Sequence, residues 1–145
     1  MGINKKISAI YLDDDETLAS VVTDFLNGIG LQVKQFHDPD EAIEEMRKNG
    51  TCYDLSLIDY RMPIKNGVQV LKEMAEHNFF GIKYNALYSS MALSTEVDED
   101  FESEGISSYS IYKIPKCPTD NSNELFQLLE TIKNEKSKKV IYGQG

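Results

Sequence analysis

The chain has 145 residues, a formal net charge of −9 and 41% hydrophobic residues, which suits one globular domain with a single core. No apolar run approaches the ~20 residues that a membrane-spanning helix needs, and no secretion signal is recognisable at the N-terminus. The negative charge argues against direct nucleic-acid binding, because phosphate contacts require a basic surface. We therefore expect a cytoplasmic protein whose domain binds neither membrane nor nucleic acid by itself.

The two cysteines, Cys52 and Cys117, lack the spacing of metal ligands, and we expect them to be free thiols in a reducing compartment. His37 and His77 are isolated in the sequence, and we expect surface or packing roles for both. Cysteine and histidine chemistry is therefore not the basis of the predicted function.

In the first third of the chain, the predicted elements alternate between strands and helices. Residues 7–12 form an apolar strand, and apolar residues then recur at helical spacing up to residue 29. Residues 31–36 begin with the alternation of a half-exposed edge strand. The stretch Asp-Pro-Asp-Glu at 38–41 predicts a helix start, because Asp is a good cap and Pro favours the first helical position. That helix should end at Gly50.

The rest of the chain continues the same alternation. Apolar runs predict three more strands, and Asn66 before Gly67 predicts the start of a helix. The predicted elements are strands over 55–58, 84–88 and 108–112, and helices from 66, over 94–104 and over 121–138. The helix over 94–104 holds six acidic residues and no basic one. It forms a solvated face or, as the alternative, a surface that favours basic partners.

Five strands that alternate with helices predict an α/β domain, a doubly wound parallel sheet with helices on both faces. We assign residues 1–138 to this domain and expect residues 139–145 to be a flexible tail. Ligands of such sheets bind beyond the carboxyl ends of the strands. The polar residues that follow each strand are therefore the candidates for a functional site.

Charged and hydroxyl side chains follow four of the five predicted strands. Asp13 and Asp14 follow the first strand, Asp59 the third, Ser89 the fourth and Lys113 the fifth. Clustered carboxylates without His or Cys suit a hard cation such as Mg²⁺ rather than zinc. A carboxylate held beside such an ion can attack phosphorus and form an acyl phosphate, while a lysine neutralises the transferred charge. This set of residues therefore indicates phosphoryl chemistry.

The motifs over residues 6–135 resemble those of response-regulator receiver domains. They read A-I-Y-L-D-D at the first strand, D-Y-R-M-P-I-K-N-G at the third, L-Y-S-S at the fourth and Y-K-I-P at the fifth. The resemblance implies a flavodoxin-like strand order 2-1-3-4-5 and a place in two-component signalling. A receiver accepts a phosphoryl group from a sensor histidine kinase or phosphotransfer protein, catalyses only its own phosphorylation and dephosphorylation, and changes the surface that its partners bind.

By this resemblance Asp59 is the phosphoacceptor, and Ser89 and Lys113 contact the phosphoryl group. Ser90 supplies a small side chain that leaves room for that group. The implied cofactor is Mg²⁺, with Mn²⁺ as the alternative. Its implied ligands are Asp13, Asp14, Asp59 and the backbone carbonyl of Arg61. The downstream effector is not identified by the sequence, which also allows a phosphorylation-dependent homodimer.

The fifth motif departs from the family pattern, since Ile114 separates Lys113 from the following proline. Lys116 repeats the same spacing before Pro118, so Lys116 is the alternative for the lysine role. The same irregularity leaves two candidates, Tyr109 and Tyr112, for the aromatic switch residue of the family.

Residues 13–18 also fit the D-x-D-x-T-L motif of haloacid-dehalogenase-like phosphatases. In that alternative Asp13 is the nucleophile and Asp15 the general acid. We prefer the receiver because no acidic pair follows Lys113 to complete such a phosphatase site, and because the R-M-P-I-K-N-G turn would go unexplained.

A third alternative is a receiver-like interaction module that is not phosphorylated. Asp15 and Glu16 could simply cap the first helix.

Overall fold

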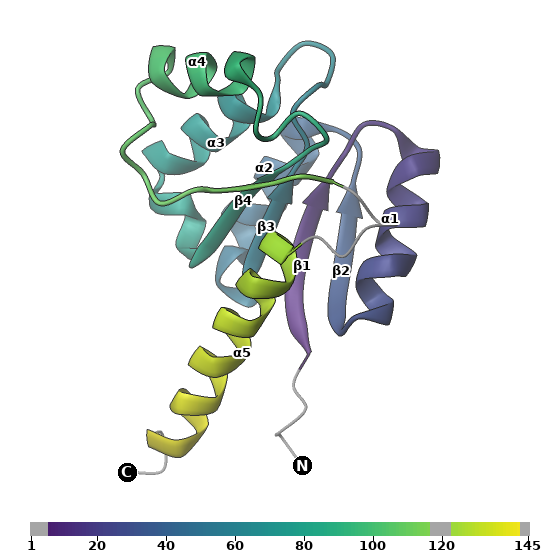
Figure 1. The fold of residues 1–145 in the computed structure, drawn as a ribbon, viewed down its shortest axis with the longest axis vertical. Helices are drawn as coiled ribbons and strands as arrows, with labels where there is room; N and C mark the ends of the chain where they lie inside the picture. The colour runs from purple at the N-terminus through teal and green to yellow at the C-terminus, as the bar shows by residue number, and fades with distance from the viewer. Residues whose placement is uncertain (1–5, 117–122, 143–145) are drawn as a thin grey trace.

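Five parallel strands form one sheet in the computed structural model, which describes residues 6–116 and 123–142 (Figure 1). The strand order is β2-β1-β3-β4-β5, which confirms the predicted architecture. The strands are β1 (Ile7–Leu12), β2 (Leu31–Phe36), β3 (Leu55–Ile58), β4 (Tyr84–Tyr88) and β5 (Tyr112–Ile114).

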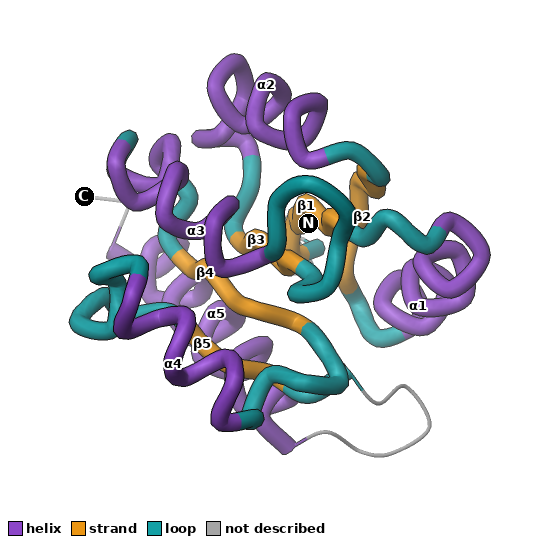
Figure 2. The backbone as a smooth tube through the Cα atoms, turned by 90° about the horizontal axis from the view of Figure 1, so that it is seen from above, coloured by secondary structure: helices purple, strands orange, loops and turns teal. Residues whose placement is uncertain are grey.

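Helices connect the strands and cover both faces of the sheet (Figure 2). They are α1 (Glu16–Gly28), α2 (Pro39–Asn49), α3 (Gly67–Glu76), α4 (Thr95–Ser103) and α5 (Asn123–Tyr142), with short 3₁₀ turns η1 (Gly50–Cys52) and η2 (Asn78–Gly81). The helix starts predicted at Asp38 and Asn66 are confirmed. The Asp38 carboxylate accepts the Glu41 backbone N–H at 3.0 Å, and Asn66 and Gln69 form a reciprocal capping box at α3.

The core has two layers, because successive side chains of a strand point to opposite faces of the sheet. Ala9 and Tyr11 of β1 belong to the layer that holds the buried residues of α1 and α5. Ile10 and Leu12 belong to the layer that holds those of α2, α3 and α4. Both layers are built from residues that are almost wholly excluded from solvent. The strands are therefore packed on both faces up to the carboxyl edge of the sheet, where the polar residues begin.

The fifth strand lies later in the chain than predicted. Residues 108–112 were expected to form it, but the strand spans Tyr112–Ile114. The segment before it turns instead, with the Tyr109 N–H bonded to the Ile106 carbonyl and the Ile111 N–H to the Tyr109 carbonyl. Ile114 is the core residue of this strand, whereas Tyr109 and Tyr112 are exposed. Burial of Ile114 therefore decides the register, and the strand end moves toward Lys116.

The remaining expectations on the chain concern its end, its cysteines and membranes. Helix α5 extends to Tyr142, and residues 143–145 lie outside the described residues, so the tail expected over 139–145 stays a prediction. Cys52 is an exposed free thiol, while Cys117 and Pro118 lie outside the described residues. No helix in the described ranges combines the length and the apolar character needed to cross a membrane.

Candidate functional site

Three carboxylates meet at the carboxyl edge of the sheet. Asp13 and Asp14 follow β1, Asp59 follows β3, and one oxygen from each lies within 4.8 Å of the others. The adjacent parallel strands bring them together, since Leu12 is paired with Ile58 in the register of β1 and β3. The Asp59 backbone N–H extends this ladder by bonding to the Leu12 carbonyl at 2.9 Å. Rigid sheet pairing thus holds residues 46 positions apart in the sequence in one cluster.

The cation of the cluster is Lys116. Its ammonium Nζ lies 2.7 Å from Asp13 Oδ2 and 3.3 Å from Asp59 Oδ1, and its side chain is only 6% exposed. The backbone supports this position, because the Lys116 N–H donates to the Ser89 carbonyl at 3.1 Å and so extends the pairing of β4 and β5. The lysine is therefore buried between two carboxylates, in a place where its charge is weakly screened.

Lys113, expected from the sequence in this position, lies elsewhere. Its Nζ forms an ion pair with Asp98 of α4 at 2.6 Å and lies 4.6 Å from the centroid of the Phe101 ring. Lys113 is inside β5 and is paired with Leu87, whose side chain belongs to the layer of α2, α3 and α4. The later position of β5 is the reason, because it puts Lys113 within the strand and Lys116 just beyond its end.

The carboxylates of the cluster differ in their proton affinity. Burial raises the pKa of Asp59 to about 6, with the Lys116 charge opposing and the Asp13 charge adding to the effect. Burial acts in the same direction on Asp13, but hydrogen bonds from Lys116, from the Tyr11 hydroxyl and from the Asp15 N–H outweigh it and lower its pKa. Asp13 is thus the more firmly ionised partner of the pair.

Ser89 lies directly after β4 and is buried. Its Oγ accepts the Met91 N–H at 3.1 Å, while its backbone N–H donates to the Ile114 carbonyl. The bond between its carbonyl and Lys116 places the two residues side by side at the edge of the sheet. Ser90 is exposed. The serine that follows β4 and the lysine that lies just beyond β5 are therefore neighbours along the backbone.

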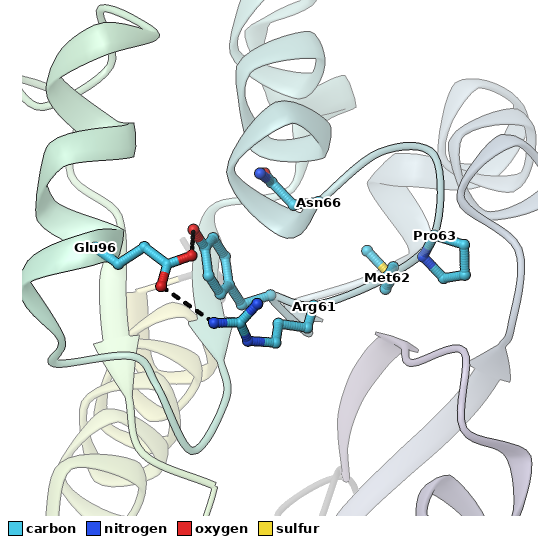
Figure 3. A pocket seen from close by; sticks show the side chains of 6 residues that line it. Arg61, Met62, Pro63, Asn66 and Glu96 are labelled. Carbon is cyan, nitrogen blue, oxygen red and sulfur yellow. Dashed lines mark hydrogen bonds and ion pairs between the residues drawn. The ribbon is translucent and has the colours of Figure 1, made fainter.

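The loop after Asp59 is tied to α4 by polar side chains (Figure 3). The Tyr60 hydroxyl hydrogen-bonds to Asp100 and, at 3.2 Å, to Glu96. The Arg61 guanidinium lies 3.1 Å from Glu96. Tyr60, Arg61 and Glu96 line an open hollow of about 350 Å³, completed by Met62, Pro63 and Asn66. The residue next to Asp59 in the sequence therefore contacts α4 directly.

Two other sets of expected residues are placed as follows. Asp15 caps α1, because its carboxylate accepts the Leu18 N–H at 3.0 Å, and it is not part of the carboxylate cluster. Tyr109 packs against Phe79 with ring centroids 5.9 Å apart, and Tyr112 lies in β5. Neither tyrosine contacts the cluster through a hydrogen bond among the described residues. The choice between them as switch residue stays a prediction.

The cluster fits a hard divalent cation. All its ligand atoms are carboxylate oxygens, they lie close enough for one ion, and no His or Cys is part of the set. Mg²⁺ favours this chemistry and is bound in proteins by one or two carboxylates together with water and phosphate oxygens. Asp14 is exposed, so water and a phosphate donor could reach the cluster from that side.

Tyr11 belongs to the site but was not singled out from the sequence. Its hydroxyl donates to Asp13 Oδ2 at 2.7 Å, and burial, followed by this hydrogen bond, raises its pKa far above the usual range. The signal was present in the strand period, since residues two apart on a strand share a face. An aromatic residue two places before Asp13 was therefore positioned to reach it.

Comparison with known proteins gives the following matches. A family model described as the response regulator receiver domain matches residues 9–109. The transcriptional regulatory protein CiaR of Streptococcus pneumoniae is 40% identical over 70 residues, which are 48% of this chain and 30% of CiaR. The putative two-component response regulator ARR21 of Arabidopsis thaliana is 25% identical over 132 residues, 91% of this chain and 20% of ARR21. The chain thus spans less than a third of these relatives.

Solved structures share the fold at lower sequence identity. The chemotaxis protein CheY4 of Vibrio cholerae has a TM-score of 0.66 at 18% identity, covering 88% of this chain and 98% of that one. The receiver domain of the Francisella response regulator 1452 has a TM-score of 0.65 at 22% identity, with coverages of 90% and 98%. A CheX–CheY–BeF₃–Mg²⁺ complex from Borrelia burgdorferi has a TM-score of 0.66 at 16% identity, with coverages of 86% and 88%.

Proposed function

Because this chain belongs to the response regulator receiver domain family, a family of two-component signalling domains, we propose that Asp59 is its phosphoacceptor. The observation that carries the proposal is the cluster itself. Asp59 lies with Asp13 and Asp14 within 4.8 Å, and with the Lys116 ammonium at 3.3 Å. A carboxylate placed among cation ligands, beside a buried ammonium, is suited to attack phosphorus and to hold the resulting dianionic group.

The proposed reaction is transfer of a phosphoryl group from a phosphohistidine, or from a small acyl phosphate, to Asp59. An Asp59 Oδ atom forms the new P–O bond as the bond from phosphorus to the donor breaks, and the bonding electrons leave with the donor. Lys116 then pairs with the phosphoryl oxygens, and the Ser89 hydroxyl donates to one of them. Water later attacks the phosphorus, the bond from phosphorus to the Asp59 oxygen breaks, and Asp59 returns to a carboxylate as inorganic phosphate leaves. The chain thus acts only on its own phosphorylation state.

Asp13, Asp14, Asp59 and the Arg61 carbonyl would hold Mg²⁺ in this proposal, with Mn²⁺ as the alternative. Bound there, the ion would neutralise negative charge on the phosphoryl oxygens. The all-oxygen donor set supports this assignment, and so does the Borrelia burgdorferi complex of similar fold, which contains Mg²⁺.

The proposed partners are a sensor histidine kinase or phosphotransfer protein upstream, in the cytoplasm, and an effector protein or a second copy of the chain downstream. The acidic helix α4 is the surface that we propose to change. It is tied to the loop after Asp59 through Tyr60 and Arg61, and to β5 through the pair of Lys113 and Asp98. Added charge at Asp59 would act on both connections and bias α4 between two positions.

Two observations argue against the phosphatase alternative. The family match is to receivers, and Asp15, its expected general acid, caps a helix instead. The unphosphorylated module is the remaining competitor. Both alternatives make predictions about where a phosphoryl group would be found.

Incubation with acetyl phosphate and Mg²⁺, followed by intact-mass and peptide mass spectrometry, tests the proposal. We expect one phosphoryl adduct on the peptide that contains Asp59, lost when the metal is chelated and lost in Asp59→Asn. Asp15→Asn is the matched control, because Asn preserves the helix cap and Asp15 lies outside the cluster. This variant should keep the adduct.

Two results would contradict the proposal in different ways. An adduct on the peptide that contains Asp13, unaffected by Asp59→Asn, would favour the phosphatase reaction. A wild-type chain that binds Mg²⁺ but gains no adduct from acetyl phosphate or from a phosphorylated histidine kinase would favour the unphosphorylated module.

A further inference from the structure

Tyr11 is a fully buried tyrosine of β1, two residues before Asp13 of the carboxylate cluster. Its hydroxyl donates to Asp13 Oδ2 at 2.7 Å, and the Lys116 ammonium bonds to the same oxygen, also at 2.7 Å. The remaining oxygen of Asp13, Oδ1, accepts the Asp15 N–H at 3.0 Å. Asp13 is thus a buried carboxylate with three donors, two of which share one oxygen.

The ring of Tyr11 also contacts the lysine. The Lys116 Nζ lies 5.3 Å from the Tyr11 ring centroid and 5.6 Å from that of Tyr88, and the two rings pack edge to face at 5.9 Å. A cation near the faces of two aromatic rings is attracted by both. Lys116 is therefore surrounded by two aromatic rings and two carboxylates. Tyr11 provides one of the rings, and its hydroxyl bonds to one of the carboxylates, that of Asp13.

The arrangement creates a competition for Asp13. In the proposed function, a metal cation needs Asp13 as a ligand, and the phosphoryl group on Asp59 needs Lys116. A cation that binds Asp13 through Oδ2, or a phosphoryl group that takes up Lys116, requires Lys116 to leave this oxygen. A buried carboxylate that loses a hydrogen-bond donor is destabilised, unless another donor stays with it. The Tyr11 hydroxyl is such a donor, it is uncharged, and it comes from the rigid strand β1.

We propose that Tyr11 is a positioning residue whose hydroxyl stays on Asp13 Oδ2 and thereby allows Lys116 to exchange between Asp13 and Asp59. This inference rests on the proposed function and extends it to a residue to which the family resemblance assigned no role. Without the hydroxyl, Asp13 would rely on Lys116 alone for its Oδ2, and the lysine would hold Asp13 more tightly against an incoming cation.

The test compares Tyr11→Phe with Tyr53→Phe by Mg²⁺ titration, without any phosphodonor, followed by NMR of the backbone amides near Asp13 and Asp59. Phe keeps the Tyr11 ring and removes only its hydroxyl. Tyr53 is a matched control, because it is buried and its hydroxyl also donates to a carboxylate, Glu45 at 2.5 Å, outside the cluster. We expect the Mg²⁺ dissociation constant to rise about tenfold in Tyr11→Phe, as for other groups that orient metal ligands, and to stay unchanged in Tyr53→Phe.

A second background separates an effect through Lys116 from a direct effect of the hydroxyl on Asp13. If Tyr11 acts through Lys116, then Tyr11→Phe should weaken Mg²⁺ binding in the wild type but not in Lys116→Met, where no lysine competes for Asp13. Circular dichroism establishes that all variants are folded under the titration conditions. Equal losses in the two backgrounds would mean that the Tyr11 hydroxyl acts on Asp13 independently of Lys116, and would overturn the inference.

The outcomes also separate this inference from the function on which it rests. Mg²⁺ binding by the wild type with the same affinity in Tyr11→Phe would refute the role of Tyr11 and leave the metal site of the proposed function intact. A wild type that does not bind Mg²⁺ would refute that metal site, and the role of Tyr11 with it.

Discussion

Replacement of Lys116 by methionine removes the positive charge that lies between the carboxylates of Asp13 and Asp59, and it keeps the approximate length of the side chain. The side chains involved are 6% exposed for Lys116, 1% for Asp13 and 15% for Asp59. Removal of one partner of a buried ion pair costs about 3–5 kcal/mol, because the other charge is left uncompensated. Asp59 can limit this cost by taking up a proton, since burial already raises its pKa to about 6.

We therefore expect Lys116→Met to lower the free energy of unfolding of the metal-free protein by about 3 kcal/mol at neutral pH. Lys113→Met is the matched control three residues earlier. Its ion pair with Asp98 is more exposed, with side-chain exposures of 30% and 60%, so we expect its contribution to be below about 1 kcal/mol. The two variants make the same chemical change and differ only in burial and partners.

Urea denaturation followed by circular dichroism measures both variants, once with a chelator and once with millimolar Mg²⁺. A cation that binds the folded state stabilises it, and it would also replace the positive charge that Lys116→Met lacks. Mg²⁺ should therefore stabilise Lys116→Met more than the wild type. Equal losses in the two lysine variants, or a Lys116→Met chain as stable as the wild type, would refute the assignment of Lys116 as the cation of the cluster.

Two further predictions concern stability away from the cluster. Ile64 is fully exposed and has a φ of 71°, in the left-handed region, where a β-branched side chain costs about 1–2 kcal/mol. Gly avoids this cost but has more freedom in the unfolded chain, so Ile64→Gly should raise the free energy of unfolding in urea by about 0.5–1 kcal/mol. A gain no larger than that of Ile64→Ala would contradict this. The hydrogen bond from Tyr53 lowers the pKa of Glu45, so this contact stabilises the fold above the unfolded pKa of Glu and is lost as pH falls through the lower folded pKa. Tyr53→Phe should therefore cost about 1 kcal/mol at pH 7 and less below about pH 4, and an equal cost at both pH values would show that the charge of Glu45 plays no part.

The lysine near the carboxylates shows where the sequence left two candidates open. Lys113 and Lys116 each stand two positions before a proline, so spacing could not separate them. The choice depends on where β5 ends, and that depends on which residue of the segment 108–116 fills the space between β4 and α5. Ile114 does so, being 1% exposed, and the strand therefore ends beyond Lys113. A difference of a few residues in strand position moved one lysine to α4 and the other to the carboxylates.

The residues that follow the central strands were easier to predict. The first three predicted strands match the observed bounds of β1, β2 and β3, and β4 also matches, because each is a continuous or alternating apolar run. The positions of Asp13, Asp14, Asp59 and Ser89 at the ends of these strands follow directly. The link from Tyr60 to α4 could not be predicted in the same way, because it depends on how closely the loop after β3 approaches a helix about 35 residues later.

The order and spacing of apolar runs, caps and polar residues in the chain were sufficient to determine the α/β architecture and a carboxylate cluster at one edge of the sheet, while the strand order was implied by the family resemblance. The architecture and the cluster follow from local periodicity and from the rule that parallel strands end together. Only the tertiary structure decided which lysine neutralises the cluster, that Tyr11 shares Asp13 with it, and how α4 is attached. Those depend on packing between segments that are far apart in the sequence, and a shift of two or three residues there changes which side chain is buried.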